Sequence, residues 1–168
     1  MITVAINGFG RIGRRVFRLI EDRNDIEVVA INDLADAKTL SHLLKYDSIH
    51  GAFQYEISHT KDAIIVKNRN VPLLKSNNPK HIDWSKLQPD FVIEATGKFK
   101  LYGDLEFHLK NGAKRVILSV PPIDEDIETV VLGVNEHLIN RDAPILSNAS
   151  CTTNNAAPMI KVIDELCG

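Results

Sequence analysis

The chain has 168 residues, of which 44% are hydrophobic, and carries 20 basic against 22 acidic side chains. This length fits one domain, which should bury about 70% of the surface that its unfolded chain exposes. The balanced charge, without a long basic block, argues against nucleic acid as a partner. Since we find neither an apolar leader nor an apolar run long enough to span a bilayer, we expect a cytoplasmic protein without membrane contact.

A glycine-rich turn follows the first strand-like run, residues 2–6. Gly8, Gly10 and Gly13 have the spacing G-x-G-x-x-G and open a helical pattern over residues 11–23. In dinucleotide-binding proteins the first glycine permits the tight turn, the second admits the pyrophosphate, and the third lets the helix approach its strand. The alternative is a tightly packed turn without a ligand.

A second apolar run, residues 26–31, ends in Asn32 and Asp33, and Asp33 lies twenty residues beyond Gly13. An acid at this distance suits the two hydroxyls of an adenosine ribose and repels a 2′-phosphate. The pattern therefore predicts NAD rather than NADP as the cofactor.

The next segments predict a helix and an antiparallel insertion. A helix over 36–48 has Asp36 as its N-cap, and alternation over 53–58 predicts a half-buried strand. The runs 63–66 and 71–74 predict a hairpin, with Pro72 confining its second strand to an edge. The whole insertion covers 53–75.

The parallel pattern then resumes. Strands are predicted over 90–97, 115–122, 129–134 and 143–148, with a helix over 103–111. Small and polar residues follow the strands at Asn7-Gly8, Asn32-Asp33, Thr96-Gly97, Ser119 and Ser147-Asn148. Each alone fits an ordinary loop, but together they favour a cofactor crevice, because open α/β sheets bind ligands at the carboxyl ends of their strands.

Cys151 follows the last predicted strand and precedes a helical pattern. The start of a helix favours the thiolate form, which makes this cysteine a candidate nucleophile, although a small buried hydrophobe is the alternative. Pro158 predicts a kink or a late helix start. Cys167 is expected to pack, and with only these two cysteines, lacking C-x-x-C spacing, we expect neither a disulfide framework nor a metal site.

These segments together carry a resemblance. Segments along the whole chain closely resemble phosphorylating glyceraldehyde-3-phosphate dehydrogenase. In order, they are NGFGRIGR, INDL, LLKYDSIHG, EATGKF, GAKRVILS, GVNEH and SNASCTTN. The resemblance implies an α/β Rossmann-type fold, a doubly wound and mostly parallel sheet with an antiparallel hairpin insertion. Residues 1–149 would form the NAD-binding domain and 150–168 the first helix of a catalytic domain that is otherwise absent.

The resemblance also implies roles for residues. Cys151 would attack glyceraldehyde 3-phosphate, and inorganic phosphate would cleave the resulting thioester to give 1,3-bisphosphoglycerate. The family's cofactor contacts would fall on Gly8, Gly10, Arg11, Ile12, Gly13, Asp33, Asn77, Thr96, Gly97 and Ser119, and its substrate contacts on Ser150 and Thr152. Asn77 stands where the family usually has arginine, which leaves one contact in doubt, and Lys98 and Lys100 are interpreted as surface variation.

Members of this family are about twice this length and form homotetramers. Their second half supplies the catalytic histidine and both anion sites, so we expect this chain to bind NAD but to lack activity alone, and we expect its six histidines on the surface. The last helix should then expose Met159, Ile160, Ile163 and Leu166 and promote self-association. Two alternatives remain: an erythrose-4-phosphate dehydrogenase-like paralogue and a stand-alone NAD-binding module.

Overall fold

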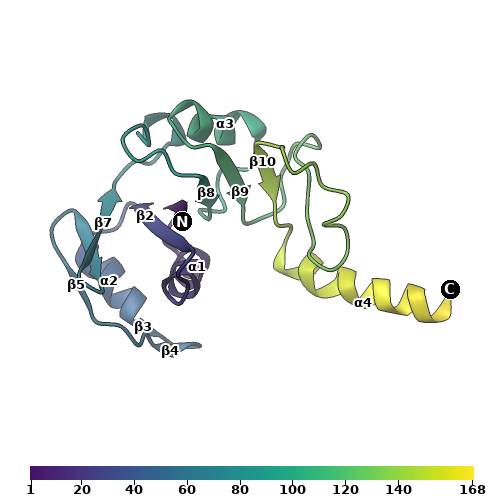
Figure 1. The fold of residues 1–168 in the computed structure, drawn as a ribbon, viewed down its shortest axis with the longest axis horizontal. Coiled ribbons are helices and arrows are strands. Elements are labelled where there is room, and N and C mark those ends of the chain that lie inside the picture. The colour runs from purple at the N-terminus through teal and green to yellow at the C-terminus, as the bar shows by residue number, and fades with distance from the viewer.

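The computed structural model describes residues 1–168 and contains one large mixed sheet (Figure 1). Its eight strands lie in the order β10-β9-β8-β1-β2-β7-β6-β5. Their bounds are β1 Ile2–Asn7, β2 Ile26–Asn32, β5 Ile57–His59, β6 Ala63–Val66, β7 Arg69–Leu74, β8 Phe91–Glu94, β9 Arg115–Leu118 and β10 Ile145–Ser147. A separate short hairpin pairs β3 (Tyr46–Asp47) with β4 (Gly51–Ala52).

The sheet is parallel from β10 to β7 and antiparallel from β7 to β5. The helices are α1 (Arg11–Glu21), α2 (Ala37–Lys45), α3 (Tyr102–Lys110) and α4 (Cys151–Cys167), with a short 3-10 helix, η1 (Pro79–His81). Helices α1 and α3 lie on opposite sides of the sheet (Figure 1). This is the doubly wound, Rossmann-type fold with an antiparallel insertion that the sequence predicted.

Alternation along β1 divides the core between the two faces of the sheet. Val4 and Ile6 belong to a cluster with Phe17 of α1 and Leu40 of α2. Ala5 points to the other face, where it packs in a second cluster with Trp84, which is fully buried. The small side chain of Ala5 leaves room for this indole against the sheet.

The insertion is paired differently from the sequence prediction. The alternation of burial over 53–58 is present, with Phe53 buried and Gln54 exposed, but β-pairing begins only at Ile57. Burial alternates because Phe53 packs in the core and Tyr55 against it. Half-buried alternation therefore does not require a paired strand here.

Strand β7 is internal, so the expectation that Pro72 confines it to an edge is wrong. Pro72 pairs with Ala63 of β6, whereas the pairing of β7 with β2 covers only Leu73 and Leu74. The missing N–H of Pro72 costs no ladder hydrogen bond to β2, because it lies just outside that paired segment. The hairpin turn is Lys67-Asn68, both with positive φ, as a two-residue type I′ turn requires.

The predicted strand over 129–134 is also absent. Only Thr129 forms an isolated parallel bridge, to Ser147, and turns follow it. The side chain of Asn135 explains the turn, since it accepts from the amide of Val131 at 2.7 Å and donates to the carbonyl of Thr129 at 2.9 Å. A side chain that binds the local backbone in this way competes with strand pairing.

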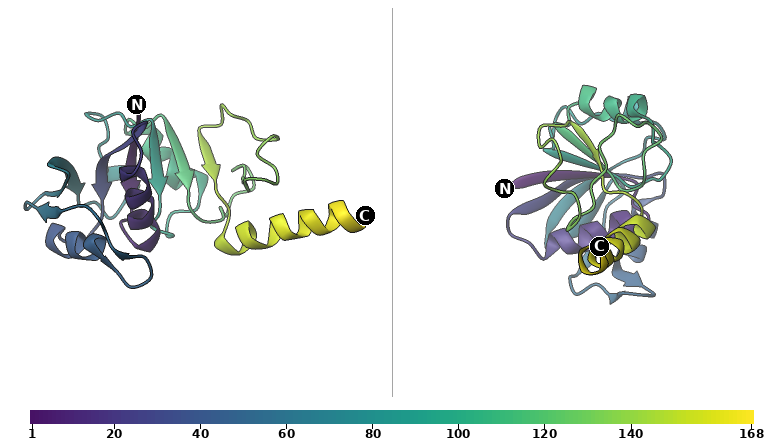
Figure 2. Two further views of the ribbon diagram at one scale, coloured as in Figure 1. Left: turned by 60° about the horizontal axis from the view of Figure 1, so that its bottom comes forward. Right: turned by 90° about the vertical axis from the view of Figure 1, so that its right-hand side faces the viewer.

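Helix α4 extends away from the sheet at the end of the chain (Figures 1 and 2). It runs through Pro158 from Cys151, so the alternative of a late start is wrong. None of its residues is buried, and Ile160 and Leu166 are 64% and 80% exposed. No helix is both long enough and apolar enough to cross a membrane.

Candidate functional site

The carboxyl ends of the central strands meet in register along one edge of the sheet. Asn7 pairs with Asn32 on one side and with Glu94 on the other, and Glu94 in turn pairs with Leu118. Leu118 pairs with Ser147. The residues that follow these strands in the sequence, Asp33 and Asn148 among them, therefore lie along this one edge of the sheet.

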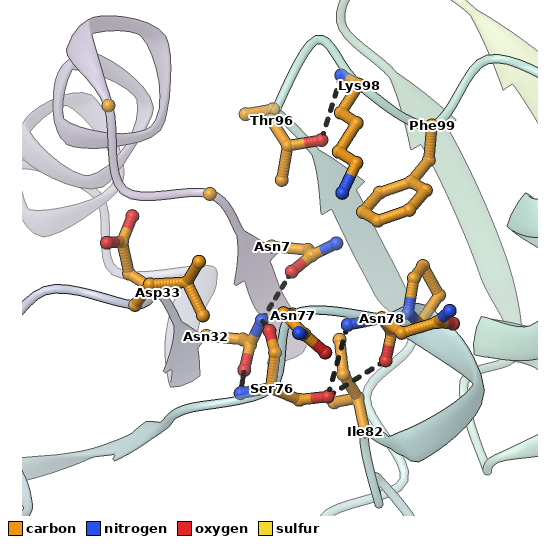
Figure 3. A pocket seen from close by; sticks show the side chains of 15 residues that line it. Asn7, Asn32, Asp33, Ser76, Asn77, Asn78, Ile82, Thr96, Lys98 and Phe99 are labelled. Atoms are coloured by element: carbon orange, nitrogen blue, oxygen red, sulfur yellow. Dashed lines mark hydrogen bonds between the residues drawn. The ribbon is translucent and has the colours of Figure 1, made fainter.

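A cleft of about 310 Å³ opens at this edge (Figure 3). It is lined by Asn7, Gly8, Gly10, Asn32, Asp33, Leu34, Ser76, Asn77, Asn78, Pro79, Ile82, Ala95, Thr96, Lys98 and Phe99. Five of the predicted cofactor residues are among them: Gly8, Gly10, Asp33, Asn77 and Thr96. The cleft contains one acidic and one basic side chain, Asp33 and Lys98.

Two glycines of the turn are required by close backbone contacts. Gly8 has φ +93°, and a Cβ there would lie 2.7 Å from the amide nitrogen of Thr96. A Cβ on Gly13 would lie 2.2 Å from the carbonyl oxygen of Gly8. The positive φ of Gly8 fits the tight turn that the sequence predicted there, and the contact at Gly13 fits the predicted close approach of α1 to its strand. The close contact between the turn and the end of β8 was not predicted.

Gly10 differs because it faces open space. A Cβ at this position would meet nothing within 4 Å, so packing within the chain does not demand glycine here. Gly10 is also the N-cap of α1, without a side-chain hydrogen bond to the first turn. The cleft therefore has, at one end, uncapped helix N–H groups beside a residue without a side chain, which is an arrangement suited to a phosphate.

Asp33 is held against the glycine turn. One carboxylate oxygen accepts from the amide of Phe9 at 2.7 Å, and the other accepts from the amide of Ala35 at 3.0 Å. A carboxylate has about four acceptor positions, so two remain for other donors. The side chain lines the cleft (Figure 3) and can accept from a pair of hydroxyls.

The wall opposite the glycine turn comes from residues 76–79, which the sequence indicated only through Asn77. Asn32 fixes this wall, since its amide donates to the carbonyl of Ser76 at 2.9 Å and its carbonyl accepts from the amide of Ser76 at 2.8 Å. Asn78 caps η1 by accepting from the amide of Lys80. An Asn-Pro pair after a strand is the signal that marks this turn in the sequence.

Lys98 and Phe99 form the remaining side of the cleft, and the lysine Nζ lies 5.2 Å from the ring centroid. Lys98 is exposed, as the interpretation of this residue as surface variation requires, and its side chain also lines the cleft (Figure 3). Lys100 does not line it. The charge of Lys98 therefore acts within the candidate site.

Beneath the cleft lies a buried polar group that the sequence did not predict. His108 and Glu94 are both 0% exposed, with His108 Nε2 3.2 Å from a carboxylate oxygen of Glu94. The expectation that every histidine lies on the surface is wrong for His108 and holds for the other five. The missed signal is Trp84, whose indole N–H needs a partner when buried and finds the Nδ1 of His108 at 3.1 Å.

The predicted nucleophile lies farther along the same edge, at the start of α4. Ser150 caps the helix by accepting from the amide of Thr153 at 2.9 Å, and Cys151 is its first residue, exposed to solvent. Ala149 precedes them with φ +58° and is buried. Cys167 is also exposed, so the expectation that it packs is wrong in this chain.

Other predicted site residues do not line the cleft. They are Arg11, Ile12, Gly13, Gly97, Ser119, Ser150 and Thr152. Arg11 and Ile12 form the exposed first turn of α1, and Ser119 donates its amide to the carbonyl of Glu94 at 3.0 Å. No group of three or more His, Cys, Asp and Glu side chains is placed to hold a metal ion.

The family model and the similar proteins that match this chain all describe the same enzyme family. Residues 2–101 match the family described as glyceraldehyde 3-phosphate dehydrogenase, NAD binding domain. Glyceraldehyde-3-phosphate dehydrogenase of Streptomyces coelicolor is 52% identical over 166 residues, which is 98% of this chain and 49% of that protein. The enzyme of Thermotoga maritima is 50% identical over 170 residues, covering 100% of this chain and 51% of its own length. The chain thus spans about half the length of the curated relatives it matches.

Proposed function

Because the chain belongs to the glyceraldehyde-3-phosphate dehydrogenase family and contains its NAD-binding domain, we propose that the cleft at the strand ends is where NAD binds. The observation that carries this proposal is the open space at Gly10, beside the uncapped start of α1. The fold does not need a glycine there, whereas a pyrophosphate that approaches the backbone does. The first-turn amides, including those of Arg11 and Ile12, would face the phosphates.

Asp33 would hold the adenosine ribose through the acceptor positions left free by Phe9 and Ala35. The order of the strands supports one orientation of the cofactor along this edge. Asp33 follows β2, and Cys151 lies beyond β10 at the other side of the same edge. Thr96, Gly97 and Ser119 follow the strands between them, so the nicotinamide end would extend past these residues toward Cys151.

For the whole protein we propose NAD-dependent oxidation and phosphorylation of glyceraldehyde 3-phosphate. Cys151 would attack the aldehyde carbon, forming a thiohemiacetal whose oxidation leaves a thioester. NAD supplies the hydride acceptor for this oxidation when bound. Inorganic phosphate would then displace the Cys151 sulfur and yield 1,3-bisphosphoglycerate, with Ser150 and Thr152 beside the substrate. A cytoplasmic homotetramer is the form that the resemblance supports.

Asp33→Asn tests the cofactor assignment. The variant should bind NAD about tenfold more weakly, because a charge-assisted hydrogen bond to the ribose is lost, and its discrimination against NADP should fall. Isothermal titration with NAD and NADP would measure both effects. Asp36→Asn is the matched control, because it removes the same charge nearby while asparagine still caps α2. An unchanged preference in Asp33→Asn would refute the ribose role.

The nucleophile assignment has an internal control, since Cys151 and Cys167 lie at opposite ends of one helix and are both exposed. The helix dipole stabilises a thiolate at its start and disfavours one at its end. Cys151 should therefore react faster with iodoacetamide than Cys167 does. Mass spectrometry of partially alkylated protein would give the two rates, and equal rates would contradict the assignment.

A further inference from the structure

The buried group beneath the cleft links two cleft-lining residues to α3. Glu94, at the end of β8, accepts from Asn7 Nδ2 at 2.5 Å and from His108 Nε2 at 3.2 Å through one oxygen. Its other oxygen accepts from the amide and the hydroxyl of Thr96, at 2.9 and 2.5 Å. Trp84 is the last member of this hydrogen-bonded network and donates to the Nδ1 of His108 at 3.1 Å.

The chemistry of Trp84 fixes the state of the imidazole. An indole N–H can only donate, so the Nδ1 of His108 must accept and cannot carry a proton. The proton of the neutral ring therefore lies on Nε2, where it is donated to Glu94. A doubly protonated ring would place two N–H groups against each other, at Trp84 Nε1 and His108 Nδ1.

With the proton on Nε2, His108 is a hydrogen-bond donor to Glu94, like the other groups around this carboxylate. Its two oxygens face four N–H or O–H groups from three residues, Asn7, Thr96 and His108. Four donors match the four acceptor positions of a carboxylate and leave none for a proton of its own. No lysine or arginine contributes to this set, so the charge is held by neutral donors alone.

Both cleft residues of this network are oriented by the carboxylate. Asn7 gives its amide to Glu94 and accepts through Oδ1 from Asn32 Nδ2 at 2.7 Å, which fixes the orientation of its carboxamide. Thr96 turns its hydroxyl proton toward Glu94 and accepts from the amide of Lys98 at 3.1 Å. Asn7, Asn32 and Thr96 line the cleft (Figure 3).

We propose that His108 and Trp84 are positioning residues for the NAD site, acting through Glu94 on Asn7 and Thr96. This inference rests on the proposed binding of NAD in the cleft. The tautomer that Trp84 imposes on His108 keeps a donor on Glu94, and Glu94 then holds the cleft floor in one arrangement before the cofactor arrives. Such preorganisation lowers the cost of ordering the site upon binding.

Trp84→Phe tests the hydrogen-bonded network at its member farthest from the cleft. Phenylalanine retains a buried ring but cannot donate, so the imidazole of His108 is free to exchange tautomers. Long-range ¹⁵N–¹H spectra of the histidine should show a single Nε2–H tautomer in the wild type and a mixture in the variant. The dissociation constant for NAD should rise about three- to tenfold, the equivalent of one net hydrogen bond.

Two further variants separate positioning from stability. His108→Gln places an amide donor near the former Nε2 and should bind NAD more tightly than His108→Leu, which has no donor. Leu105→Val, on the same helix, removes buried apolar volume without touching the network and should leave both the NAD affinity and the tautomer unchanged. All titrations are made well below the unfolding temperature of each variant.

The outcomes distinguish this inference from the proposed function. A wild-type chain that does not bind NAD refutes the proposed function. Wild-type binding with an unchanged affinity in Trp84→Phe refutes the positioning role, as does an Nδ1–H or doubly protonated His108 in the wild-type spectrum. Weaker binding in Leu105→Val equal to that in Trp84→Phe would assign the effect to helix packing and would also refute it.

Discussion

At the amino ends of β1 and β8, opposite the cleft, Asp90 joins strands that are distant in the sequence. Its carboxylate accepts from the amide and the hydroxyl of Thr3, at 2.8 and 3.0 Å, and from the Nζ of Lys114 at 2.7 Å. The Lys114 hydrogen bond, followed by those from Thr3, lowers the pKa of Asp90 from 3.8 to about 2. The ionised carboxylate therefore stabilises the folded chain.

This shift predicts a dependence of stability on pH. Because the pKa is lower in the folded state, the stabilisation is complete above about pH 4 and is lost as the pH falls toward 2. Asp90→Asn should reduce the free energy of unfolding by about 1 to 2 kcal/mol at pH 7, and the difference from wild type should shrink below pH 4. Urea unfolding between pH 7 and pH 3 would measure it.

Asp142→Asn is the control for Asp90→Asn, because the Asp142 side chain is 96% exposed. The same loss of charge there should change the free energy of unfolding by less than about 0.5 kcal/mol. A difference between Asp90→Asn and wild type that stays constant from pH 7 to pH 3 would show that the carboxylate charge is not the cause.

At the scale of the elements, local patterns predicted the type of each helix correctly and failed for strands that depend on neighbours. The helices at 36–48 and 103–111 appear as α2 and α3, and Asp36 caps α2 by accepting from the amide of Thr39. Helix α2 ends earlier than predicted, at Lys45, because Tyr46 and Asp47 pair with β4. The run at 129–134 has the composition of a strand but folds as turns around Asn135. Composition cannot reveal which edge offers a partner, because the partner comes from elsewhere in the chain.

Strand β7 illustrates the same limit. A proline in a strand-like run favours an edge, because a central strand needs its N–H groups on both sides. The structure keeps Pro72 in an internal strand by ending the pairing with β2 one residue away. The length of that pairing is set by the packing of two strands far apart in sequence, which no local pattern encodes.

At the scale of the whole molecule, α4 is the helix that buries none of its residues. Met159, Ile160, Ile163 and Leu166 lie at helical spacing and are all exposed. Burial of each such side chain stabilises a protein by about 1.5 to 3 kcal/mol. Contiguous apolar exposure of this kind marks an interaction surface.

The exposed stripe predicts that the 168-residue chain self-associates. Sedimentation velocity should show a concentration-dependent increase in the weight-average sedimentation coefficient. The double variant Ile160→Glu, Ile163→Glu should abolish the increase, because it places two charges within the stripe. Leu19→Glu, which changes a 50% exposed side chain on α1, should not affect it. A chain that sediments as a monomer at all concentrations would contradict the prediction.

The sequence by itself determined the features that depend on neighbours along the chain. The glycine turn, the cap of α2, the Asp33 position and the start of α4 at a cysteine all follow from local spacing and backbone geometry. These features also carry the family resemblance, and they predict an NAD site at the carboxyl ends of the strands.

Only the tertiary structure decided what lies beneath and across the cleft. Asn7 and His108 are 101 positions apart in the sequence, yet both are within reach of Glu94. Periodicity along a helix shows which residues share a face, but it cannot show that a histidine on that face meets a carboxylate and an indole. That encounter depends on the order of the strands and on the packing of α3, both of which are set by contacts distant in the chain.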